Sequence, residues 1–159
     1  MEYHNIAPIY NSHSKVLILG SFPSVKSREV QFFYSHPQNR FWKVLSAVLQ
    51  VPLPTTIQDR KSMLLTNRIA LWDVVSSCEV VGSSDSTIKD VVVNDISTIL
   101  NTSKVEAIYT NGSTAHRLYK KYLLSSTNVQ DIPLPSTSSA NARWQLQDLI
   151  SAWNVIINF

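Results

Sequence analysis

A short run of apolar residues near the N-terminus, Lys15-Val16-Leu17-Ile18-Leu19, ends at Gly20. A strand with one face in water alternates apolar and polar side chains, but this run has no polar residue after Lys15. Such a strand is buried on both faces, which is typical of the centre of a parallel sheet covered by helices. The rest of the chain must therefore supply further strands beside this run and helices on both of its faces.

The remaining sequence alternates between helix and strand patterns. Apolar residues at Phe41, Val44, Leu45 and Val48 predict an amphipathic helix over residues 40–50. Apolar runs predict further strands at residues 68–72, 105–109 and 131–134. Further helices are expected within residues 61–66, at 95–100 after the N-cap Asn94, at 113–122 capped by Ser113, and at about 142–153, with Trp144, Leu146, Leu149 and Ile150 available for its buried side. We predict an α/β protein with a three-layer α/β/α architecture and a central, mainly parallel four-stranded sheet.

Composition agrees with one domain over residues 1–159, because 44% hydrophobic and 16% charged residues are typical of a globular protein. No stretch approaches the roughly 20 apolar residues of a membrane span, and the N-terminus lacks the pattern of a signal peptide. We therefore expect a cytoplasmic monomer with no membrane partner. One cysteine, Cys78, and four scattered histidines show no metal-ligand spacing, so no metal or cofactor is expected. The balance of 14 basic to 11 acidic residues permits binding to a polyanion without establishing it.

The polar loops that follow the predicted strands fall at one edge of the sheet. In doubly wound α/β proteins, ligands bind beyond the carboxyl ends of the strands. These loops are residues 20–37, 73–85 (with an exposed turn at 83–86), 111–112 and 135–141. The sequence therefore predicts a cleft made from loops that are far apart in the chain.

Several motifs in these loops carry a family resemblance. Leu19-Gly20-Ser21-Phe22-Pro23-Ser24, His36-Pro37-Gln38-Asn39-Arg40-Phe41-Trp42-Lys43 and Leu134-Pro135-Ser136-Thr137-Ser138 resemble the mismatch-specific and thymine-type branch of the uracil-DNA glycosylase superfamily. Ala70-Leu71-Trp72-Asp73-Val74, Ser77-Cys78-Glu79, Asp85-Ser86 and the continuation to Asn141 resemble its hypoxanthine-DNA (deoxyinosine) glycosylase family. The resemblance spans about residues 15–153. It implies a uracil-DNA glycosylase-like fold and a monofunctional enzyme of base-excision repair. Its partner would be DNA containing a deaminated base, deoxyinosine or as a second candidate deoxyuracil, flipped into a pocket.

The resemblance also implies a catalytic residue. Mismatch-specific relatives hold the attacking water with an asparagine in the first loop, but the matching position here is Phe22. The hypoxanthine-glycosylase resemblance implies Asn39 as the substitute, with its side-chain carbonyl orienting the water. An N-cap for the helix beginning at Arg40 is the structural alternative for Asn39. Asp73 is a weaker candidate to activate water, with a turn or cap after a strand as its alternative, and Asp85 has a similar but weaker claim. His36 is a weaker candidate to stabilise the leaving base, with orientation of the loop beside Pro37 as its alternative.

Base recognition is assigned by the resemblance to Gly20, Ser21, Phe22, Tyr34 and Asn111. Tyr34 occupies the position where relatives place an aromatic ring against the flipped base. Its alternative role is to anchor the loop in the core with Phe32 and Phe33, of which one is expected to be a core residue. The amide of Asn111 can bond to both a carbonyl and the adjacent N–H of hypoxanthine or uracil. A helix-entry turn is its structural alternative.

Contacts to the DNA backbone are expected from hydroxyls and N–H groups before the last helix. These groups belong to the segment Pro135-Ser136-Thr137-Ser138, for which a solvated connection is the structural alternative, and Ser24 in the first loop is expected to contact a phosphate from the other side. Asn141 and Arg143 are the candidates to enter the vacated base space or to contact the opposite strand. Two other hypotheses stay open. One is a damage sensor that kept the pocket and lost the chemistry, which Phe22 motivates. The other is a small-molecule enzyme. The chain has only three glycines, which form no dinucleotide or phosphate loop, and this disfavours that hypothesis.

Overall fold

The apolar run forms strand β2 (Val16–Gly20), all of whose residues are buried in the computed structural model, which describes residues 1–158. β2 lies in a four-stranded sheet whose strands are all parallel, in the order β3-β2-β6-β7. The other three strands are β3 (Ile69–Asp73), β6 (Ala107–Asn111) and β7 (Ile132–Leu134). The predicted central parallel sheet is therefore confirmed, and β6 lies two residues later than expected.

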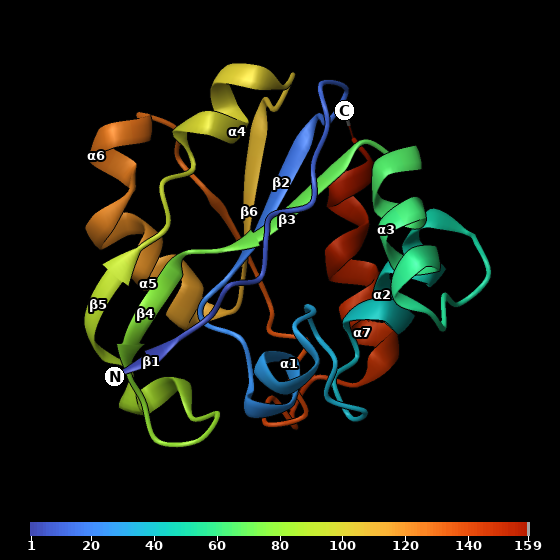
Figure 1. The fold of residues 1–159 in the computed structure, drawn as a ribbon. Coiled ribbons are helices and arrows are strands. Elements are labelled where there is room, and N and C mark those ends of the chain that lie inside the picture. Colours follow the sequence, from blue (N-terminus) through green and yellow to red (C-terminus); the bar gives the residue numbers. More distant parts are fainter. Residues whose placement is uncertain (159) are drawn as a thin grey trace.

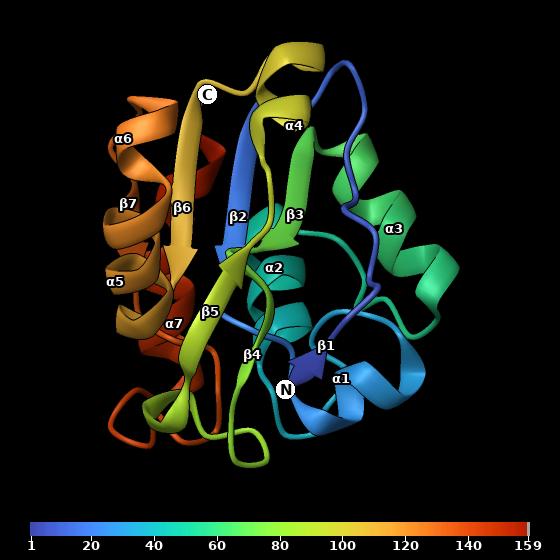
Figure 2. The same cartoon turned by 60° about the vertical axis from the view of Figure 1, so that its left-hand side comes forward.

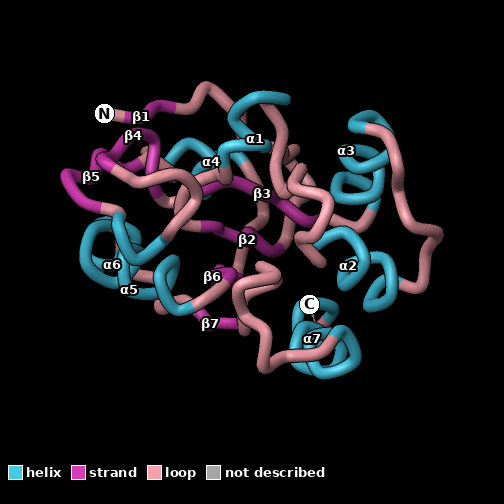
Figure 3. Tube along the Cα trace, turned by 90° about the horizontal axis from the view of Figure 1, so that it is seen from below, coloured by secondary structure: helices cyan, strands magenta, loops and turns pink. Residues whose placement is uncertain are grey.

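Alternate residues of β2 face opposite layers of helices. Val16 and Ile18 belong to one apolar core, whereas Leu17 and Leu19 belong to another on the opposite face. Figure 3 shows the two helical layers on either side of the strands. The first core includes residues of α2 (Phe41–Leu49), α3 (Ile57–Thr66) and α7 (Leu146–Trp153), and the second includes residues of α4 (Ser97–Thr102) and α5 (Ser113–Tyr122), which α6 (Leu124–Thr127) follows. The three-layer α/β/α prediction is confirmed.

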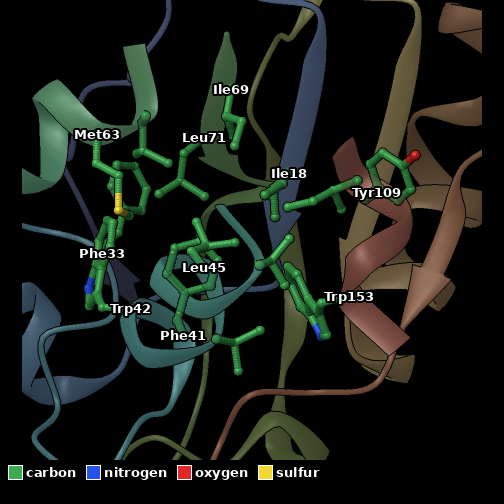
Figure 4. Packing of buried hydrophobic residues seen from close by; sticks show 14 of the residues in the cluster. Ile18, Phe33, Phe41, Trp42, Leu45, Met63, Ile69, Leu71, Tyr109 and Trp153 are labelled. Atoms are coloured by element: carbon green, nitrogen blue, oxygen red, sulfur yellow. The ribbon is translucent and has the colours of Figure 1, made fainter. Parts of the chain in front are cut away.

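Large aromatic side chains fill the first core. Phe41 at the start of α2 and Trp153 at the end of α7 meet edge to face, with ring centroids 5.9 Å apart. Both are completely buried, and Figure 4 shows them beside Leu45 and Ile18. Burying an aromatic side chain of this size contributes about 1.5–3 kcal/mol. The N-terminal end of α2, where the second motif ends, is therefore packed against the sheet.

A second, antiparallel sheet lies beside the first, and no pattern in the sequence predicted it. Its order is β1-β4-β5 (Figure 1), formed by β1 (Glu2–Tyr3), β4 (Val75–Glu79) and β5 (Lys89–Val93). Polar residues such as Ser76 and Ser77 interrupt the apolar pattern of β4. The sheet brings residues near the N-terminus next to the end of β3, because β4 begins two residues after β3 ends. Short helices α1 (Val25–Val30), η1 (Asp85–Thr87) and η2 (Asn154–Ile157) complete the elements.

Several helix boundaries differ from the predictions. Asn94 is not an N-cap, because its amide donates to the carbonyl of Asp73 and α4 begins only at Ser97. Ser113 is the first residue of α5 rather than its cap, which is Gly112 with a φ of 96°. The last helix begins at Leu146, after a capping box between Gln145 and Asp148.

The buried side of the last helix is narrower than expected. Trp144 and Leu146 are both 38% exposed, because Trp144 precedes the helix and Leu146 faces outward, whereas Leu149 is buried and Ile150 is half-buried. No helix within residues 1–158 is long and apolar enough to cross a membrane.

Candidate active site

A cavity of about 310 Å³ lies beyond the carboxyl ends of β2, β3 and β6, the end of the molecule toward which the strand arrows point in Figure 2. β3 and β6 lie on opposite sides of β2, so the cavity stands at a topological switch point of the sheet. Ligands usually bind at such a point in this architecture. The predicted cleft is present. It is lined by Gly20, Ser21, Phe22, Pro23, Ser24, Ser27, Phe33, Tyr34, His36, Asn39, Asp73, Ser83, Asp85, Asn111 and residues 136–140.

The floor of the cavity is crowded around Gly20. A Cβ atom added at this residue would lie 2.5 Å from Oδ1 of Asp73 and 2.8 Å from the hydroxyl oxygen of Tyr34. Both distances are shorter than real side chains tolerate, so only glycine allows these two polar groups to approach the end of β2. Gly20 therefore contributes space at the floor, where a carboxyl and a phenol lie near each other, and its predicted contact with the base stays a prediction.

Three polar side chains from separate loops form one hydrogen-bond network. The backbone N–H of Thr137 donates to Oδ1 of Asn111 (3.1 Å), and Nδ2 of Asn111 donates to the Thr137 hydroxyl (3.0 Å). That hydroxyl donates in turn to Oδ1 of Asn39 (2.9 Å). Oδ1 of Asn39 also accepts from the backbone N–H of Phe41 (2.9 Å). Because the backbone N–H groups can only donate, the orientation of both amides is fixed.

This network bears directly on Asn39. Its side-chain oxygen already accepts two hydrogen bonds, which occupy both lone pairs of a carbonyl. One of them holds the start of α2, as the structural alternative predicted, although Arg40 occupies the N-cap position itself. A water held by this oxygen would have to displace one of the two donors. The role of Asn39 in positioning water stays a prediction. Its Nδ2 group makes no hydrogen bond within this network.

Tyr34 lies in a left-handed backbone conformation (φ 49°) between the cavity and the core. Its ring stacks on Phe41 with centroids 4.0 Å apart, so a flipped base can use only the opposite face. Its hydroxyl is buried without a hydrogen-bond partner among residues 1–158, and burial raises the pKa of this phenol. Stacking on the base stays a prediction. Phe32 and Phe33 are both buried, whereas only one of them was expected in the core.

Asp73 is the last residue of β3, and only 3% of it is exposed. Its Oδ2 atom has no hydrogen-bond partner within residues 1–158. Burial raises the pKa of this carboxyl to about 7, and the negative charge of Asp85 adds to the effect. Asp73 therefore differs from the solvated turn residue that was its structural alternative.

The group nearest to Oδ2 of Asp73 that can carry a positive charge is His4, with Nε2 at 3.9 Å. Nε2 of His4 lies 2.7 Å from the carbonyl oxygen of Val75, and its Nδ1 accepts from the N–H of Ile6 (3.3 Å). These contacts fix the neutral tautomer with the proton on Nε2, and burial lowers the pKa of the imidazole. His4 therefore does not neutralise Asp73.

The first loop holds the opposite wall of the cavity. The hydroxyl of Ser21 donates to Oδ1 of Asp85 (2.9 Å). Asp85 lies on an exposed turn, and it also lines the cavity. Burial also raises the pKa of Asp85. The ring of Phe22 lies between His4 and the guanidinium of Arg28, whose Cζ is 5.1 Å from the ring centre. Phe22 therefore has an apolar and cationic environment, and its side chain has no polar atom that could hold a water.

Two further predicted residues act within their own loops. Ser24 is the N-cap of α1 and accepts from the N–H of Ser27. His36 is exposed, and its Nδ1 accepts from the N–H of Gln38 (3.1 Å). Both residues also line the cavity, so their predicted roles toward phosphate and leaving base stay open.

The loop over residues 135–144 is organised by Arg40, whose importance the sequence did not reveal. Its guanidinium donates to the carbonyl oxygens of Thr137, Ser138 (2.9 Å), Asn141 (3.2 Å) and Trp144. The backbone N–H of Arg40 also donates to Thr137 (3.0 Å). A planar group with five donors is suited to such a task, whereas lysine is not.

The predicted DNA contacts in this loop separate into two groups. Ser136 and Ser138 line the cavity, whereas Thr137 is completely buried. Its N–H and hydroxyl both bond to other side chains, so a phosphate contact from Thr137, which stays a prediction, would have to replace one of these bonds. The remaining three lie outside the cavity lining: Pro135 accepts from Nε1 of Trp153, Asn141 donates to the Ser136 carbonyl, and Arg143 is exposed.

Asp85, Arg40 and His4 are the site residues that sequence reasoning underweighted or missed. Asp85 was given only a weak claim to activate water, His4 lies outside every motif, and Arg40 was treated as the start of a helix. The position of Arg40 inside the second motif was the one available signal. Within residues 1–158, no three histidine, cysteine, aspartate or glutamate side chains gather as a metal site would require.

Comparison with known proteins agrees with this geometry. The model of the family "Uracil DNA glycosylase superfamily" matches residues 7–156. A hypoxanthine DNA glycosylase from Methanosarcina acetivorans is 33% identical over 150 residues, which cover 93% of both chains. One from Methanosarcina barkeri is 29% identical over 155 residues and 96% of both chains.

A solution NMR structure of a candidate uracil DNA glycosylase from Methanosarcina acetivorans superimposes with a TM-score of 0.84 and 31% identity, over 99% of this chain and 97% of that one. Family model, relatives and structure thus agree along almost the whole length. The chain belongs to the uracil DNA glycosylase superfamily.

Proposed function

We propose that this protein is a monofunctional DNA glycosylase that removes hypoxanthine from deoxyinosine flipped out of DNA, with uracil as the second candidate base. The two relatives are named for hypoxanthine, which supports the choice of the first base. No lysine lines the cavity formed by the described residues, which supports simple hydrolysis over a Schiff-base mechanism.

The observation that carries the proposal is the fixed amide of Asn111 at the floor of the cavity. Thr137 occupies one lone pair of its oxygen and one hydrogen of its nitrogen, which leaves one acceptor and one donor for a ligand. Hypoxanthine presents a carbonyl oxygen next to an N–H, and uracil presents the same pair. Adenine presents the reverse order and would leave the two amide groups of Asn111 unpaired, at a cost of about 1–3 kcal/mol for each.

The surrounding groups suit the other tasks of a base-excision enzyme. Ser24, Ser136 and Ser138 stand at the cavity, where their hydroxyls can contact the phosphates beside the flipped nucleotide. Asn141 and Arg143 lie in the loop held by Arg40, from which a side chain can enter the space that the base leaves. The free face of the Tyr34 ring can stack on the base, which contributes about 1–3 kcal/mol.

In the proposed reaction a water attacks C1′ of the sugar, the bond from C1′ to the base breaks, and the base departs with the electron pair. The products are an abasic site and the free base. Asn39 is proposed to position the water at the cavity wall, through its Nδ2 group or after its oxygen exchanges the Thr137 donor for the water. The asymmetry of charge in the transition state explains why hydrogen-bond donors belong near the base oxygen.

The test is a base-release assay on labelled duplexes that contain inosine, uracil or xanthine. We expect the protein to release hypoxanthine by itself, and the strand to be cleaved only after alkali treatment. Asn111→Ala should lower the rate on inosine by roughly 10²-fold or more, since a fixed polar contact to the base is lost. Asn101→Ala, on the exposed side of α4, is the matched control. Failure of the wild-type protein to release a base from any of these duplexes refutes the proposal.

A damage sensor without turnover is the second candidate, and two observations favour it. Phe22 replaces the water-holding asparagine of the mismatch-specific relatives, and the oxygen of Asn39 has no free lone pair. Tight binding of an inosine duplex without base release identifies a sensor. If excision occurs and Asn39→Ala abolishes it while binding persists, the enzymatic proposal with Asn39 stands.

A further inference from the structure

The cavity floor holds one carboxyl group whose surroundings favour the neutral form. Asp73 lines the cavity, Oδ1 stands beside Gly20 and the Tyr34 hydroxyl, and Oδ2 has no partner within residues 1–158. An ionised carboxylate normally accepts several hydrogen bonds when it is buried, because leaving it unpaired is costly. The geometry therefore points to a carboxyl that carries a proton and has nothing in the protein to give it to.

The charged and titratable groups that face Asp73 agree with this interpretation. From the N-terminal segment, His4 is held neutral by Val75 and Ile6. From η1, Asp85 adds a negative charge that opposes ionisation, and from the loop before α2, Tyr34 presents an uncharged phenol. Arg28 pairs with Glu2 (3.0 Å) and stacks over Phe22, so its guanidinium has partners other than Asp73.

We propose that Asp73 is a catalytic acid, which donates its carboxyl proton to N7 of the flipped hypoxanthine as the glycosidic bond breaks. This inference rests on the proposed function. Asn111 uses the O6 and N1–H positions of the base, and N7 is the acceptor next to O6 on the adjoining edge. N7 also shares the five-membered ring with N9, so a proton there draws electron density out of the bond from C1′ to N9.

The step balances without any further reactant. The bond from C1′ to N9 breaks, its electron pair stays on the base, and the proton of Asp73 forms a new N–H bond at N7. Water forms the new C1′–O bond and loses one proton, which returns through solvent to the Asp73 carboxylate. The products are neutral hypoxanthine and the abasic sugar. Uracil has no equivalent of N7, so the same group favours a purine over a pyrimidine.

A single-turnover pH profile on an inosine duplex tests the proposal. An acid works only while protonated, so the wild-type rate should be highest at acidic pH and fall as pH rises through about 7, the pKa to which burial brings Asp73. Asp73→Asn keeps the size of the side chain but has no proton to transfer. We expect its rate to fall by roughly 100-fold or more and its falling limb to vanish, since acid–base catalysis typically contributes 10²–10⁴-fold.

Asp85→Asn is the matched variant at the second carboxyl of the cavity. It removes the negative charge that raises the pKa of Asp73, so the falling limb should persist and move to lower pH. Binding of each variant to a duplex with uncleavable 2′-fluoroarabino-inosine separates loss of chemistry from loss of folding or affinity. On a duplex with 7-deaza-deoxyinosine, which lacks N7, the wild-type protein and Asp73→Asn should release the base at the same slow rate.

Three results would overturn the inference. A rate that rises with pH through the same range identifies a general base, an unchanged falling limb in Asp73→Asn assigns it to another group, and normal release of 7-deazahypoxanthine excludes N7. Each leaves the proposed function intact, because hypoxanthine is still released. Absence of release by the wild-type protein at every pH instead refutes the proposed function together with this inference.

Discussion

Replacing Thr137 by valine removes one oxygen atom from the centre of the site while keeping the shape of the side chain. The hydroxyl donates to Asn39 at 2.9 Å and accepts from Asn111 at 3.0 Å, and the residue is completely buried. Each hydrogen bond contributes about 0.5–1.5 kcal/mol, and an amide hydrogen left without a partner adds a further penalty. We therefore expect Thr137→Val to lower the free energy of unfolding by about 2–3 kcal/mol.

Thermal unfolding followed by circular dichroism measures this loss. In a chain of this length, 1 kcal/mol corresponds to roughly 2–4 °C in Tm, so we expect Tm to fall by about 5–10 °C. Base release should slow as well, because Asn111 keeps only its bond from the Thr137 N–H and its amide nitrogen becomes free to rotate. The dependence of DNA binding on salt should not change, since both partners of the Thr137 hydroxyl are amides of the protein.

Thr137→Ser is the control, because it keeps the hydroxyl and loses only a methyl group, at a cost of about 1 kcal/mol. The reasoning is refuted if Thr137→Val is as stable as Thr137→Ser. It is also refuted if the valine variant shows a shallower salt dependence of binding, since that would make Thr137 a phosphate contact after all.

Three further predictions concern other parts of the site. Gly20→Ala should abolish base release and lower stability by about 1–3 kcal/mol, because its Cβ would meet Asp73 and Tyr34 at 2.5 and 2.8 Å; wild-type activity in this variant would contradict the crowded floor. Asp73→Asn should make the protein more stable above pH 7 and leave it nearly unchanged below pH 4, by denaturant unfolding at each pH. The folded-state pKa of about 7 lies above the ordinary value of 3.8, so the protonated carboxyl of Asp73 stabilises the fold. This stabilisation is lost as pH rises through 7, and its upper limit is about 4 kcal/mol; equal stabilities of the two proteins at pH 8 would show that the buried carboxylate does not destabilise the fold. Arg40→Lys should raise KM for the duplex without changing its salt dependence, because the guanidinium contacts loop carbonyls; a reduced salt slope would show a direct phosphate contact instead.

The central sheet was predictable because its strands are buried on both faces and their apolar runs have no other explanation. The run over residues 15–19 and the alternation of elements led to the right layers and the right sheet. The β1-β4-β5 sheet was not predictable in the same way. β1 has only Glu2 and Tyr3, β5 is largely exposed, and serines interrupt the apolar pattern of β4. Their pairing depends on tertiary contacts that no local pattern records.

Most residues that line the cavity could be predicted from the sequence, but the hydrogen bonds and burial of each residue could not. Motif spacing brought Gly20, Asn39, Asp73 and Asn111 to one cavity, as parallel strands require. Hydrogen-bond partners depend on which atoms meet across loops, and these showed Thr137 to be buried between two amides. The same holds for the burial of Asp73, since the aspartate of an exposed turn and that of a cavity floor have the same local sequence.

The contact between His4 and the back of Asp73 has a consequence for where the working unit of this protein begins. Every motif that carries the family resemblance starts at or after residue 15, and the family model itself starts at residue 7. A shortened protein cut at either boundary would keep all of those motifs and still lose the imidazole that shields the carboxyl. Water would reach Asp73 from behind, and its acidity would return toward that of an ordinary aspartate. The first residue of the family model and the first residue that shapes the acid are thus two different positions in the same chain.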